Sequence, residues 1–519
     1  MSSIIGRTLA VALTGLEGHM VEVEALIQPG LPNFALVGLP DAALGEARDR
    51  VRAAILATGL DFPPQRITVN LSPASLPKSG SGFDLAIAVA VLTAAGLISP
   101  DQHPGVVYIG ELALDGRARP VRGVLPAVVA AIDAGCPKIV VPQANAAEAS
   151  LVTGAKVLAV ASLEELVYRL GASVAPPAPH RRVQPLPVDH SNASKTATPK
   201  PPPDLAEVLG QHEARLALEI AAAGGHHLLM VGPPGTGKTM LAARLPGLLP
   251  PLAETEAVEV TAVHSVAGLL KAENGLISTP PFQDPHHTAT PASIVGGGTG
   301  LPRPGAVSLA HRGVLFLDEA PEFSSRVLQT LRQPLERGEV VIHRAAGIAR
   351  FPAAFHLVMA ANPCPCGHGW GRGEACTCSS LTKRRYFGRL SGPLLDRLDM
   401  VVGVEPVGTV ALGQGACGEP SHQVAGRVAA ARRVQTKRYQ AHGWQLNSQA
   451  PGSYLRERLK AGSGIELTLR RGLESGALSL RGADRVLRVA WTIADLAGRS
   501  GPSDADCDLA MALRLRGSQ

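Results

Sequence analysis

At 519 residues, the chain is too long for one hydrophobic core, so we expect two to four domains. Hydrophobic residues make up 45% and charged residues 18%, a balance typical of a soluble globular protein. Residues 420–519 hold 16 Lys and Arg against 8 Asp and Glu, whereas the whole chain carries only +6. This basic region is a candidate nucleic-acid surface, although a solvated helical surface would account for it equally well.

The sequence shows no segment that targets or spans a membrane. Its first residues, MSSIIGRTLAVALTG, have no charged stretch ahead of an apolar core, so they do not predict a signal peptide. The most apolar run, residues 83–98, contains Asp84 and is shorter than a bilayer-spanning helix. We therefore expect a cytoplasmic protein without a membrane partner. Seven cysteines fit a reducing compartment.

In chain order, the composition predicts four segments. Residues 1–172 mix strand-like runs such as ITVNL and KIVVP with Ala-rich helices, so the fold there is α/β or α+β. Residues 173–203, rich in Pro and polar residues, predict a linker. Residues 204–405 predict an α/β core, and residues 406–519 have the Leu, Ala and Arg spacing of helices. Within the core we expect a strand at 226–231, a helix at 240–249 and a buried strand at 313–320.

The stretch GPPGTGKT predicts a nucleotide-binding P-loop, because a strand precedes it and a helix follows it. An accidental glycine turn is the alternative. Backbone N–H groups of the loop would cradle the phosphates of ATP. Lys238 would reach the β- and γ-phosphates, and the Thr239 hydroxyl would bind Mg²⁺. The nucleotide-binding candidates are Gly232, Pro233, Pro234, Gly235, Thr236, Gly237, Lys238, Thr239 and Asp318.

Polar residues at the ends of later strands predict the rest of the ATPase site. Asp318 ends the buried strand LFL near the metal, and Glu319 beside it is placed to polarise the attacking water. Asn362 ends another apolar strand, where its amide could orient water. Arg397 is a candidate arginine finger for a neighbouring subunit's ATP, which would require a ring or at least a dimer. A surface salt bridge is the alternative for Arg397.

Four cysteines crowd into CPCGHGWGRGEACTC. Cys364, Cys366, Cys376 and Cys378 form two C-x-C pairs that could supply four thiolates to a tetrahedral Zn²⁺. C-x-C is tighter than the usual C-x₂-C of zinc ribbons, and His368 is a possible substitute ligand. A reduced loop and a redox switch are the alternatives.

Longer stretches carry a family resemblance. GQHEARLALEIAAAGGHHLLMVGPPGTGKT, DPHHTATPASIVGGG, RPGAVSLAHRGVLFLDEAPEF, LRQPLERGEVVIHRA and NPCPCG together resemble the bacterial ComM/YifB family of magnesium-chelatase-like AAA+ ATPases. The resemblance covers nearly the whole chain. It implies a helix-2-insert, pre-sensor-1 AAA+ core, a C-terminal helical lid and a hexameric ring. It also implies a DNA helicase that drives branch migration during integration of transforming DNA.

Residue by residue, the resemblance implies the following roles. Asn362 matches sensor 1, Arg397 the arginine finger, and Arg481 the sensor 2 of a lid that closes over bound nucleotide. Leu480 before that arginine and Asp284 in PFQDPHH depart from the small residues usual there.

The two insertions of the family match the segments around His286–His287 and residues 339–350, which line or guard the pore. His343, Arg344 and Arg350 are therefore candidates for contacting a DNA backbone. Packing of this hairpin against a neighbouring subunit is the alternative.

The N-terminal region resembles the Lon protease catalytic domain through LPKSGSGFDLAIAVAVL and GELALDGRARPVRGVLPAV. The alignment places Gly82 at the serine and Ala127 at the lysine of the protease dyad. Ser79 and Ser81 lie nearby without an evident base. The resemblance therefore predicts a non-proteolytic structural or DNA-binding module.

Together these features predict an ATP-driven ring motor that uses Mg²⁺ and acts on single-stranded or branched DNA without sequence preference. A magnesium-chelatase-like subunit that drives metal insertion into a tetrapyrrole is the rival hypothesis, and a protein-remodelling ATPase is a third. The Lon-like region and the four-cysteine loop favour the DNA motor over the chelatase subunit.

Overall fold

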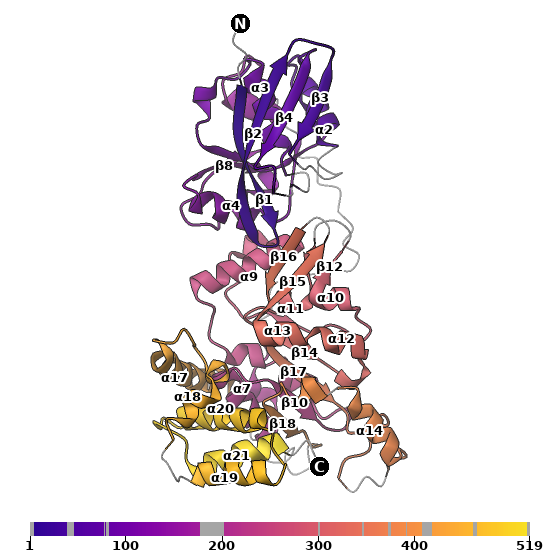
Figure 1. Cartoon of the computed structure of the whole chain (residues 1–519), viewed down its shortest axis with the longest axis vertical. Helices are drawn as coiled ribbons and strands as arrows, with labels where there is room; N and C mark the ends of the chain where they lie inside the picture. The colour runs from indigo at the N-terminus through magenta and orange to yellow at the C-terminus, as the bar shows by residue number, and fades with distance from the viewer. Residues whose placement is uncertain are drawn as a thin grey trace.

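The computed structural model of the chain describes residues 5–38, 46–76, 78, 82–176, 202–298, 302–344, 347–371, 375–390, 392–406, 418–459 and 464–515. The chain forms three blocks, and the first two follow one another along the long axis of the molecule (Figure 1). An N-terminal sheet domain lies at one end, a P-loop core lies in the middle, and the C-terminal helices pack beside the far end of the core. Most of the predicted linker, residues 177–201, lies outside the described residues.

The N-terminal block is a mixed seven-stranded sheet with helices packed on it. The strand order is β3-β4-β2-β1-β5-β8-β9. β1 and β2 form a long antiparallel hairpin, whereas β3 pairs with β4, β5 with β1, and β9 with β8 in parallel. The helix α3 is buried along almost its whole length, which explains the apolar run of residues 83–98. The strands and helices are β1 (Ile5–Thr14), β2 (Glu17–Gln28), β3 (Asn33–Val37), α2 (Ala47–Ala57), β4 (Arg66–Ser72), α3 (Asp84–Ala94), β5 (Val106–Tyr108), β6 (Glu111–Leu112), β7 (Ala118–Arg119), α4 (Val124–Asp133), β8 (Lys138–Pro142), α5 (Ala146–Ala149), β9 (Lys156–Val160) and α6 (Leu163–Arg169).

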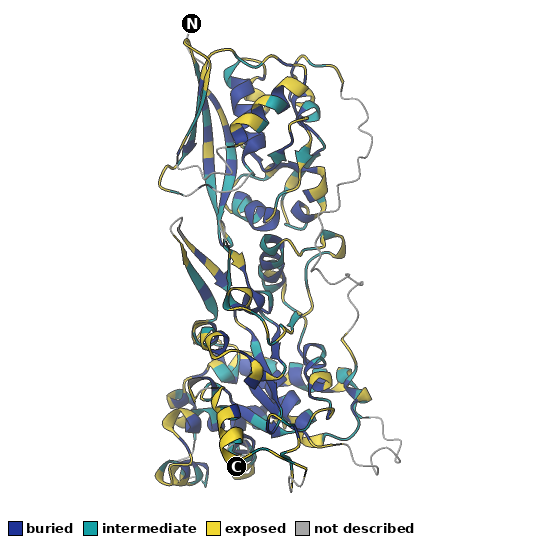
Figure 2. Ribbon diagram, turned by 90° about the vertical axis from the view of Figure 1, so that its right-hand side faces the viewer, coloured by how far each residue is buried: buried dark blue, intermediate teal, exposed yellow. Residues whose placement is uncertain are grey.

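The middle block is a parallel five-stranded sheet in the order β11-β14-β17-β10-β18. Its central strands are buried on both faces, as their uninterrupted apolar runs predict (Figure 2). Its elements are α7 (His212–Gly224), β10 (Leu228–Val231), α8 (Lys238–Ala242), α9 (Glu254–Ala267), β11 (Phe282–Gln283), α10 (Pro291–Val295), β12 (Gly296–Gly297), β13 (Arg303–Pro304), α11 (Ala306–Leu309), β14 (Val314–Leu317), α12 (Ser325–Thr330), α13 (Arg332–Arg337), β15 (Glu339–Arg344), β16 (Gly347–Pro352), β17 (His356–Ala361), α14 (Ser380–Gly388), α15 (Gly392–Leu395) and β18 (Met400–Gly403).

One predicted helix of the core is shorter than expected. The sequence predicts a continuous helix over 240–249, but α8 ends at Ala242 and a 3-10 turn covers Leu245–Leu248. Pro246 causes the break, because its ring lacks an N–H donor and disfavours a helical conformation in the preceding residue.

The C-terminal block is helical, as the Leu, Ala and Arg spacing predicts. Its helices are α17 (Ser421–Tyr439), α18 (Gly452–Arg456), α19 (Gly464–Glu474), α20 (Leu480–Leu496) and α21 (Asp504–Leu515). The helix α20 begins where the Ser479 hydroxyl accepts a hydrogen bond from the Gly482 N–H at 3.1 Å. Its buried face packs on α7 and α21, which continues the hydrophobic core of the P-loop block into the C-terminal helices.

The N-terminal block is joined to the core by polar contacts as well as packing. The helix α4 lies against α9 of the core. The buried carboxylate of Glu148 accepts hydrogen bonds from the Leu125 N–H in the N-terminal block and from the Ser265 hydroxyl of α9. Gly15, at the turn between β1 and β2, forms a backbone bridge with Arg350 of β16. The N-terminal block therefore rests on two elements of the core, the helix α9 and the hairpin β15–β16.

Candidate nucleotide site and cysteine cluster

The glycine loop, residues 232–237, connects β10 to α8. Gly235 and Gly237 have φ angles of 76° and 88°, in the left-handed region that glycine adopts without strain. At Gly232, a β-carbon would lie 2.1 Å from the carbonyl oxygen of Val404, so a larger residue does not fit. The backbone of the loop therefore requires these glycines, as a loop whose N–H groups cradle phosphates does.

The ammonium group of Lys238 lies inside this loop. It donates hydrogen bonds to the carbonyl oxygens of Gly232 and Pro233, both at 2.7 Å, and lies 3.3 Å from Oδ1 of Asn362. Burial lowers the pKa of Lys238, and the negative charges of Asp318 and Glu319 oppose that effect. Its hydrogen-bonding partners are neutral oxygens, which a lysine at this position could exchange for the charged oxygens of a phosphate.

The strand order explains why three distant segments meet at this loop. β17 lies between β10 and β14, and the three strands are parallel, so their carboxyl ends share one edge of the sheet. Lys238, Asn362 and Asp318 each follow one of these strands. The structure therefore brings the predicted P-loop, amide and acidic pair to one place, with Asn362 between the other two.

The hydroxyl and carboxylate that the sequence predicts as Mg²⁺ ligands are in direct contact. The Thr239 hydroxyl donates a hydrogen bond to Asp318 Oδ2 at 2.6 Å, and Asp318 Oδ1 accepts one from the Glu319 N–H at 2.9 Å. Oxygen ligands of this kind suit a hard cation such as Mg²⁺. The residues present therefore fit a magnesium ion held with the phosphates of ATP.

Glu319 has an unusual backbone and an unpredicted partner. Its φ of 50° is left-handed, a conformation that costs a non-glycine residue energy and recurs at functional sites. Oε2 of Glu319 lies 3.4 Å from Nδ1 of His287, whose ring lies tilted against that of His286, with the ring centroids 4.1 Å apart. The pKa of Asp284 is raised, first by burial and also by the charge of Asp318. The segment around His286–His287, which the family resemblance assigns to an insertion, therefore lies against the acidic pair.

Arg397 and Arg481 lie elsewhere, in one cavity of about 970 Å³ between the core and the C-terminal helices. The side chain of Arg397 forms an ion pair with Glu336 of α13, and Arg485 nearby pairs with the buried Asp399.

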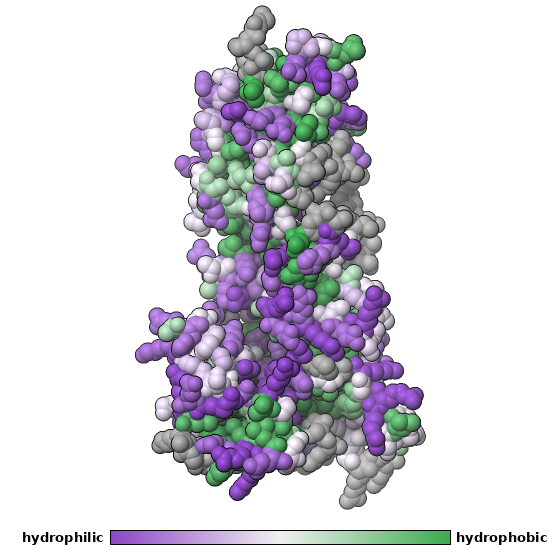
Figure 3. Space-filling view, in the orientation of Figure 1, coloured by the Kyte–Doolittle hydropathy of each residue, from purple (hydrophilic) through white to green (hydrophobic). Residues whose placement is uncertain are grey.

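Hydrophilic residues dominate the middle of the face drawn in Figure 3, over the P-loop core.

This arginine cavity lies at the opposite edge of the sheet from the P-loop. Its lining includes His227, Arg312, His356 and Asp399, which stand at the amino ends of β10, β14, β17 and β18. The phosphate-binding residues stand at the carboxyl ends, on the order of 15 Å away at the rise of a β-strand. That span exceeds the length of an arginine side chain. Arg397 and Arg481 are therefore turned away from the nucleotide loop of their own chain.

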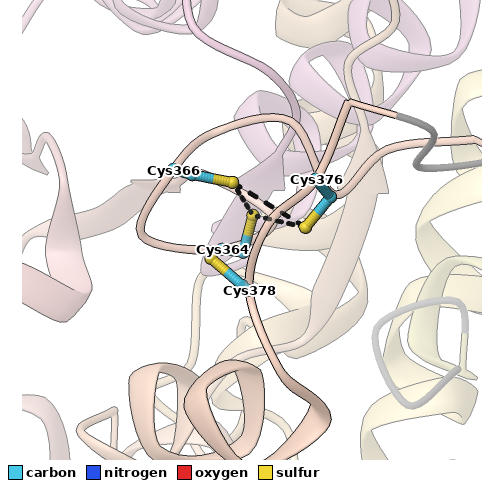
Figure 4. A group of neighbouring side chains, drawn as sticks. All are labelled: Cys364, Cys366, Cys376 and Cys378. Carbon is cyan, nitrogen blue, oxygen red and sulfur yellow. Dashed lines mark hydrogen bonds between the residues drawn. The ribbon is translucent and has the colours of Figure 1, made fainter.

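The four predicted cysteines come together (Figure 4). All four sulfur atoms lie within 4.8 Å of one another, and Cys376 Sγ lies 3.7 Å from Sγ of both Cys364 and Cys366. A tetrahedron of thiolates around zinc has edges of about 3.8 Å, so the group could hold such an ion. Gly369 donates its N–H to Cys364 Sγ at 3.2 Å. His368 is exposed and is not one of the clustered ligands.

The cysteine loop also touches the nucleotide loop. A β-carbon built on Gly367 would lie 2.6 Å from Cγ of Pro234, and one on Gly403 would lie 2.8 Å from the Trp370 ring. The cluster therefore packs against the P-loop of its own chain and the end of β18. In the sequence these cysteines lie between Asn362 and Arg397, but the contact with Pro234 depends on how the loop folds back.

The candidates for DNA contact differ in their surroundings. His343 and Arg344, at the end of β15, are exposed. Arg350, on the partner strand β16, pairs with Glu339 at 3.3 Å, and its backbone bridges to Gly15 of the N-terminal block. The hairpin thus presents Arg344 to solvent, while Arg350 lies near the junction with the N-terminal block.

At the positions aligned with a protease dyad, Gly82 has no side chain and Ala127 is a buried methyl group in α4. Neither residue supplies a nucleophile or a base. Ser79 and Ser81 lie outside the described residues.

The fold and the site define a P-loop ATPase core of the magnesium-chelatase type. Residues 204–412 match the family described as magnesium chelatase, subunit ChlI. Residues 23–145 match subunit ChlI of Mg-chelatase, and residues 418–516 match its C-terminal family.

Full-length relatives narrow this class further. A protein of Mycobacterium tuberculosis is 50% identical over 515 residues, 99% of both chains. Competence protein ComM of Haemophilus influenzae is 41% identical over 490 residues, which cover 94% of this chain and 93% of ComM. YifB of Escherichia coli is 40% identical over 93% of this chain and 92% of its own length. The chain therefore belongs to the ComM/YifB family of magnesium-chelatase-like AAA+ proteins.

A local similarity concerns the N-terminal block. The Lon protease of Rhizobium meliloti is 28% identical over 151 residues, 27% of this chain and 18% of the protease. This match supports the predicted Lon-like character of part of the block. Among the described residues, no helix has the length and apolar character needed to cross a membrane.

Proposed function

We propose that the chain is the subunit of an ATP-hydrolysing ring that moves DNA, with helicase or branch-migration activity. One observation carries the ring: Lys238, Asp318 and Glu319 lie at one edge of the sheet, whereas Arg397 and Arg481 lie at the other. A subunit arranged in this way has both halves of an ATPase site but cannot join them. Head-to-tail contact between neighbours would join them, and such contacts close into rings. The family resemblance favours six subunits.

In this proposal, each residue of the P-loop edge has one task. Lys238 leaves its two loop carbonyls and binds the β- and γ-phosphates. Thr239 and Asp318 would hold Mg²⁺, which would supply positive charge to offset the negative charge of the phosphates. Glu319 accepts a proton from the attacking water, while Asn362 orients that water. Arg397 of one subunit stabilises the charge at its neighbour's phosphate, and Arg481 of the C-terminal lid closes over that same nucleotide.

DNA is the proposed partner for two reasons. The exposed His343 and Arg344 lie on the hairpin that the family resemblance places at the pore, and the C-terminal region has an excess of positive charge. The relative in Haemophilus influenzae is named a competence protein, which fits a role in integration of transforming DNA. A motor of this kind would bind phosphates rather than base edges and so show little sequence preference.

The test is the ATPase rate of the full-length protein with and without single-stranded and branched DNA at low salt. The proposal predicts a rate that rises with either DNA and a binding affinity that falls steeply with salt. No binding to either DNA would overturn the motor. It would favour the chelatase-like ATPase or the protein-remodelling ATPase instead.

A first prediction concerns the hairpin. Replacing Arg344 and Arg350 with alanine should weaken DNA binding about tenfold and lower DNA-stimulated ATPase more than the rate without DNA. The reason is that the hairpin supplies phosphate partners but no group of the nucleotide site. Because Arg350 also pairs with Glu339, the Glu339→Gln variant is the control: it breaks the ion pair, keeps both arginines and should bind DNA like the parent. Equal losses in both variants would assign the effect to folding of the hairpin.

We also propose that the cysteine cluster holds one structural Zn²⁺ that keeps the loop folded against the P-loop. The sulfur spacing and the Gly369 N–H bond to Cys364 support this role. Because Gly367 contacts Pro234, an ion that keeps the cysteine loop folded would also support the conformation of the nucleotide loop.

A second prediction follows for the metal. Elemental analysis should find about one zinc per chain, and Cys364→Ser with Cys376→Ser should remove it. The metal-free variant should bind ATP more weakly and assemble less well, since Pro234 loses its packing partner. Cys136→Ser is the matched control, because Cys136 lies in the N-terminal block away from the cluster. A native protein without metal that binds ATP and forms rings would leave the cysteines without this role.

For the N-terminal block we propose a structural or DNA-binding role without proteolysis. Gly82 and Ala127 cannot act as nucleophile and base, and the block rests directly on α9 and the hairpin β15–β16. Its position suits a platform that holds the insertions of the core in place.

A further inference from the structure

Three arginines from different segments lie along the junction between the N-terminal block and the core. Arg122, just before α4, lies against the end of α9: a β-carbon on Gly268 would be 2.7 Å from its Nε. The helix α9 contacts β13, which carries Arg303. Arg303 pairs in register with Gly297 of β12, and Nη2 of Arg344 would be 3.3 Å from a β-carbon on Gly297. The three side chains therefore follow one another across the seam; together they are called the arginine row.

The charges of the arginine row are not neutralised within the described residues. All three side chains are exposed, and no ion pair in the described part of the chain involves them. The pKa of Arg122 is lowered, first by partial burial and also by the positive charge of Arg303. By contrast, Arg312 and Arg350 at the same junction pair with Glu256 and Glu339. Like charges left side by side repel each other, and a bound anion would relieve that repulsion.

Three glycines lie beside the row, of which Gly296 packs against the backbone of Arg303 and Gly298 is open. Gly296, Gly297 and Gly298 have φ angles of 101°, 149° and 130°, values that side chains disfavour. Gly298 has no heavy atom within 4 Å of the position of a β-carbon. A strip without side chains between Arg303 and Arg344 lets an extended chain come close to both guanidinium groups. Guanidinium groups bind phosphate oxygens with two parallel hydrogen bonds.

We propose that the arginine row is a binding surface for the sugar–phosphate backbone of DNA, to which the N-terminal block contributes Arg122. This inference rests on the proposed DNA motor and extends the partner surface from Arg303 and Arg344 of the AAA+ core to Arg122 of the N-terminal block. The observations favour a phosphate chain over an acidic protein segment, because the row is solvent-facing and is bordered by glycine backbone that has no side chain to contact a protein segment. The hydrogen bond from the Ser265 hydroxyl of α9 to Glu148 joins the N-terminal block to the core near the row.

The test measures binding of fluorescein-labelled oligo(dT) and of a labelled four-way junction by the full-length protein over a series of salt concentrations. Arg122→Ala with Arg303→Ala should raise Kd about tenfold and reduce the slope of log Kd against log salt by about 1 to 2, as lost phosphate contacts require. Replacing Arg122 with lysine instead of alanine keeps the positive charge, so it should restore much of the slope of log Kd against log salt. Arg117→Ala is the matched control, because Arg117 is an exposed arginine of the same block that pairs with Asp115 at 2.7 Å.

The outcomes separate this inference from the proposed function. If the parent binds DNA and the double variant binds with the same Kd and slope, the arginine row is wrong and the motor stands. If the parent protein binds neither oligo(dT) nor the four-way junction, both the arginine row and the DNA motor are wrong. If the double variant binds DNA normally but no longer forms the parent's oligomer in light scattering, the row is a subunit contact and the proposal is overturned. Thermal unfolding of each variant shows whether a loss of binding reflects a loss of fold.

Discussion

Glu319→Gln should keep ATP binding and lose turnover, with the hydrolysis rate falling about 10²- to 10⁴-fold. The amide preserves the size of the side chain and leaves Lys238, Thr239 and Asp318 in place, but it cannot accept the proton of the attacking water. Lys238→Ala should instead weaken binding itself, because the loop then lacks the charge that meets the phosphates. A fluorescent ATP analogue measures binding, and phosphate release measures turnover.

A nearby acid provides the control for this experiment. Glu322 lies three residues further along the chain and pairs with Arg389 at 3.1 Å, so Glu322→Gln makes the same chemical change beside the site. It should hydrolyse ATP at the parent rate. If Glu319→Gln does so as well, Glu319 is not the base, and His287, which contacts it, becomes the next residue to test.

Arg397→Ala should abolish ATP hydrolysis with and without DNA, a loss of about 10³- to 10⁵-fold, the range for an arginine finger. The expected effect is large because Arg397 would face the phosphates of a neighbour. Each chain should still bind ATP, since its own P-loop lies at the other edge of the sheet. Arg389→Ala, which removes an arginine that pairs with Glu322, is the matched control.

Mixing two inactive variants tests whether Arg397 acts between subunits. Arg397→Ala subunits keep the P-loop and Lys238→Ala subunits keep the finger, so about a quarter of the interfaces in a random mixed ring hold one intact site. ATPase activity should therefore reappear on mixing, although each variant alone is inactive. With ring assembly confirmed by light scattering, a mixture that stays inactive would contradict a finger acting in trans.

Short-range features of the site could be predicted from the sequence because they are local. Glycines at fixed spacing between a strand and a helix define the P-loop, and the chain direction alone places Asp318 and Glu319 at the end of β14. Two C-x-C pairs likewise indicate a cluster, and the sulfur atoms of Cys364 and Cys376 lie 3.7 Å apart. The buried helix α3 is also visible as an apolar run in the sequence.

Features that depend on the order of strands or on the path of an insertion could not be predicted. The sequence places Arg397 and Arg481 in the ATPase machinery, but only the parallel sheet shows that they stand at the edge opposite the P-loop. His287 lies 32 residues before Glu319, and nothing in the spacing predicts their contact. The packing of Gly367 on Pro234 and the arginine row arise in the same way, from segments that meet only after folding.

The most direct measurement is movement of a branched DNA substrate by the full-length protein. A labelled four-way junction is incubated with ATP and Mg²⁺, and its conversion to separated duplexes is followed on a gel. We predict conversion that requires ATP, is lost in Glu319→Gln and in Arg397→Ala, and declines as salt weakens phosphate contacts. A protein that hydrolyses ATP in a ring but neither binds the junction nor moves its branch point at low salt would contradict the account.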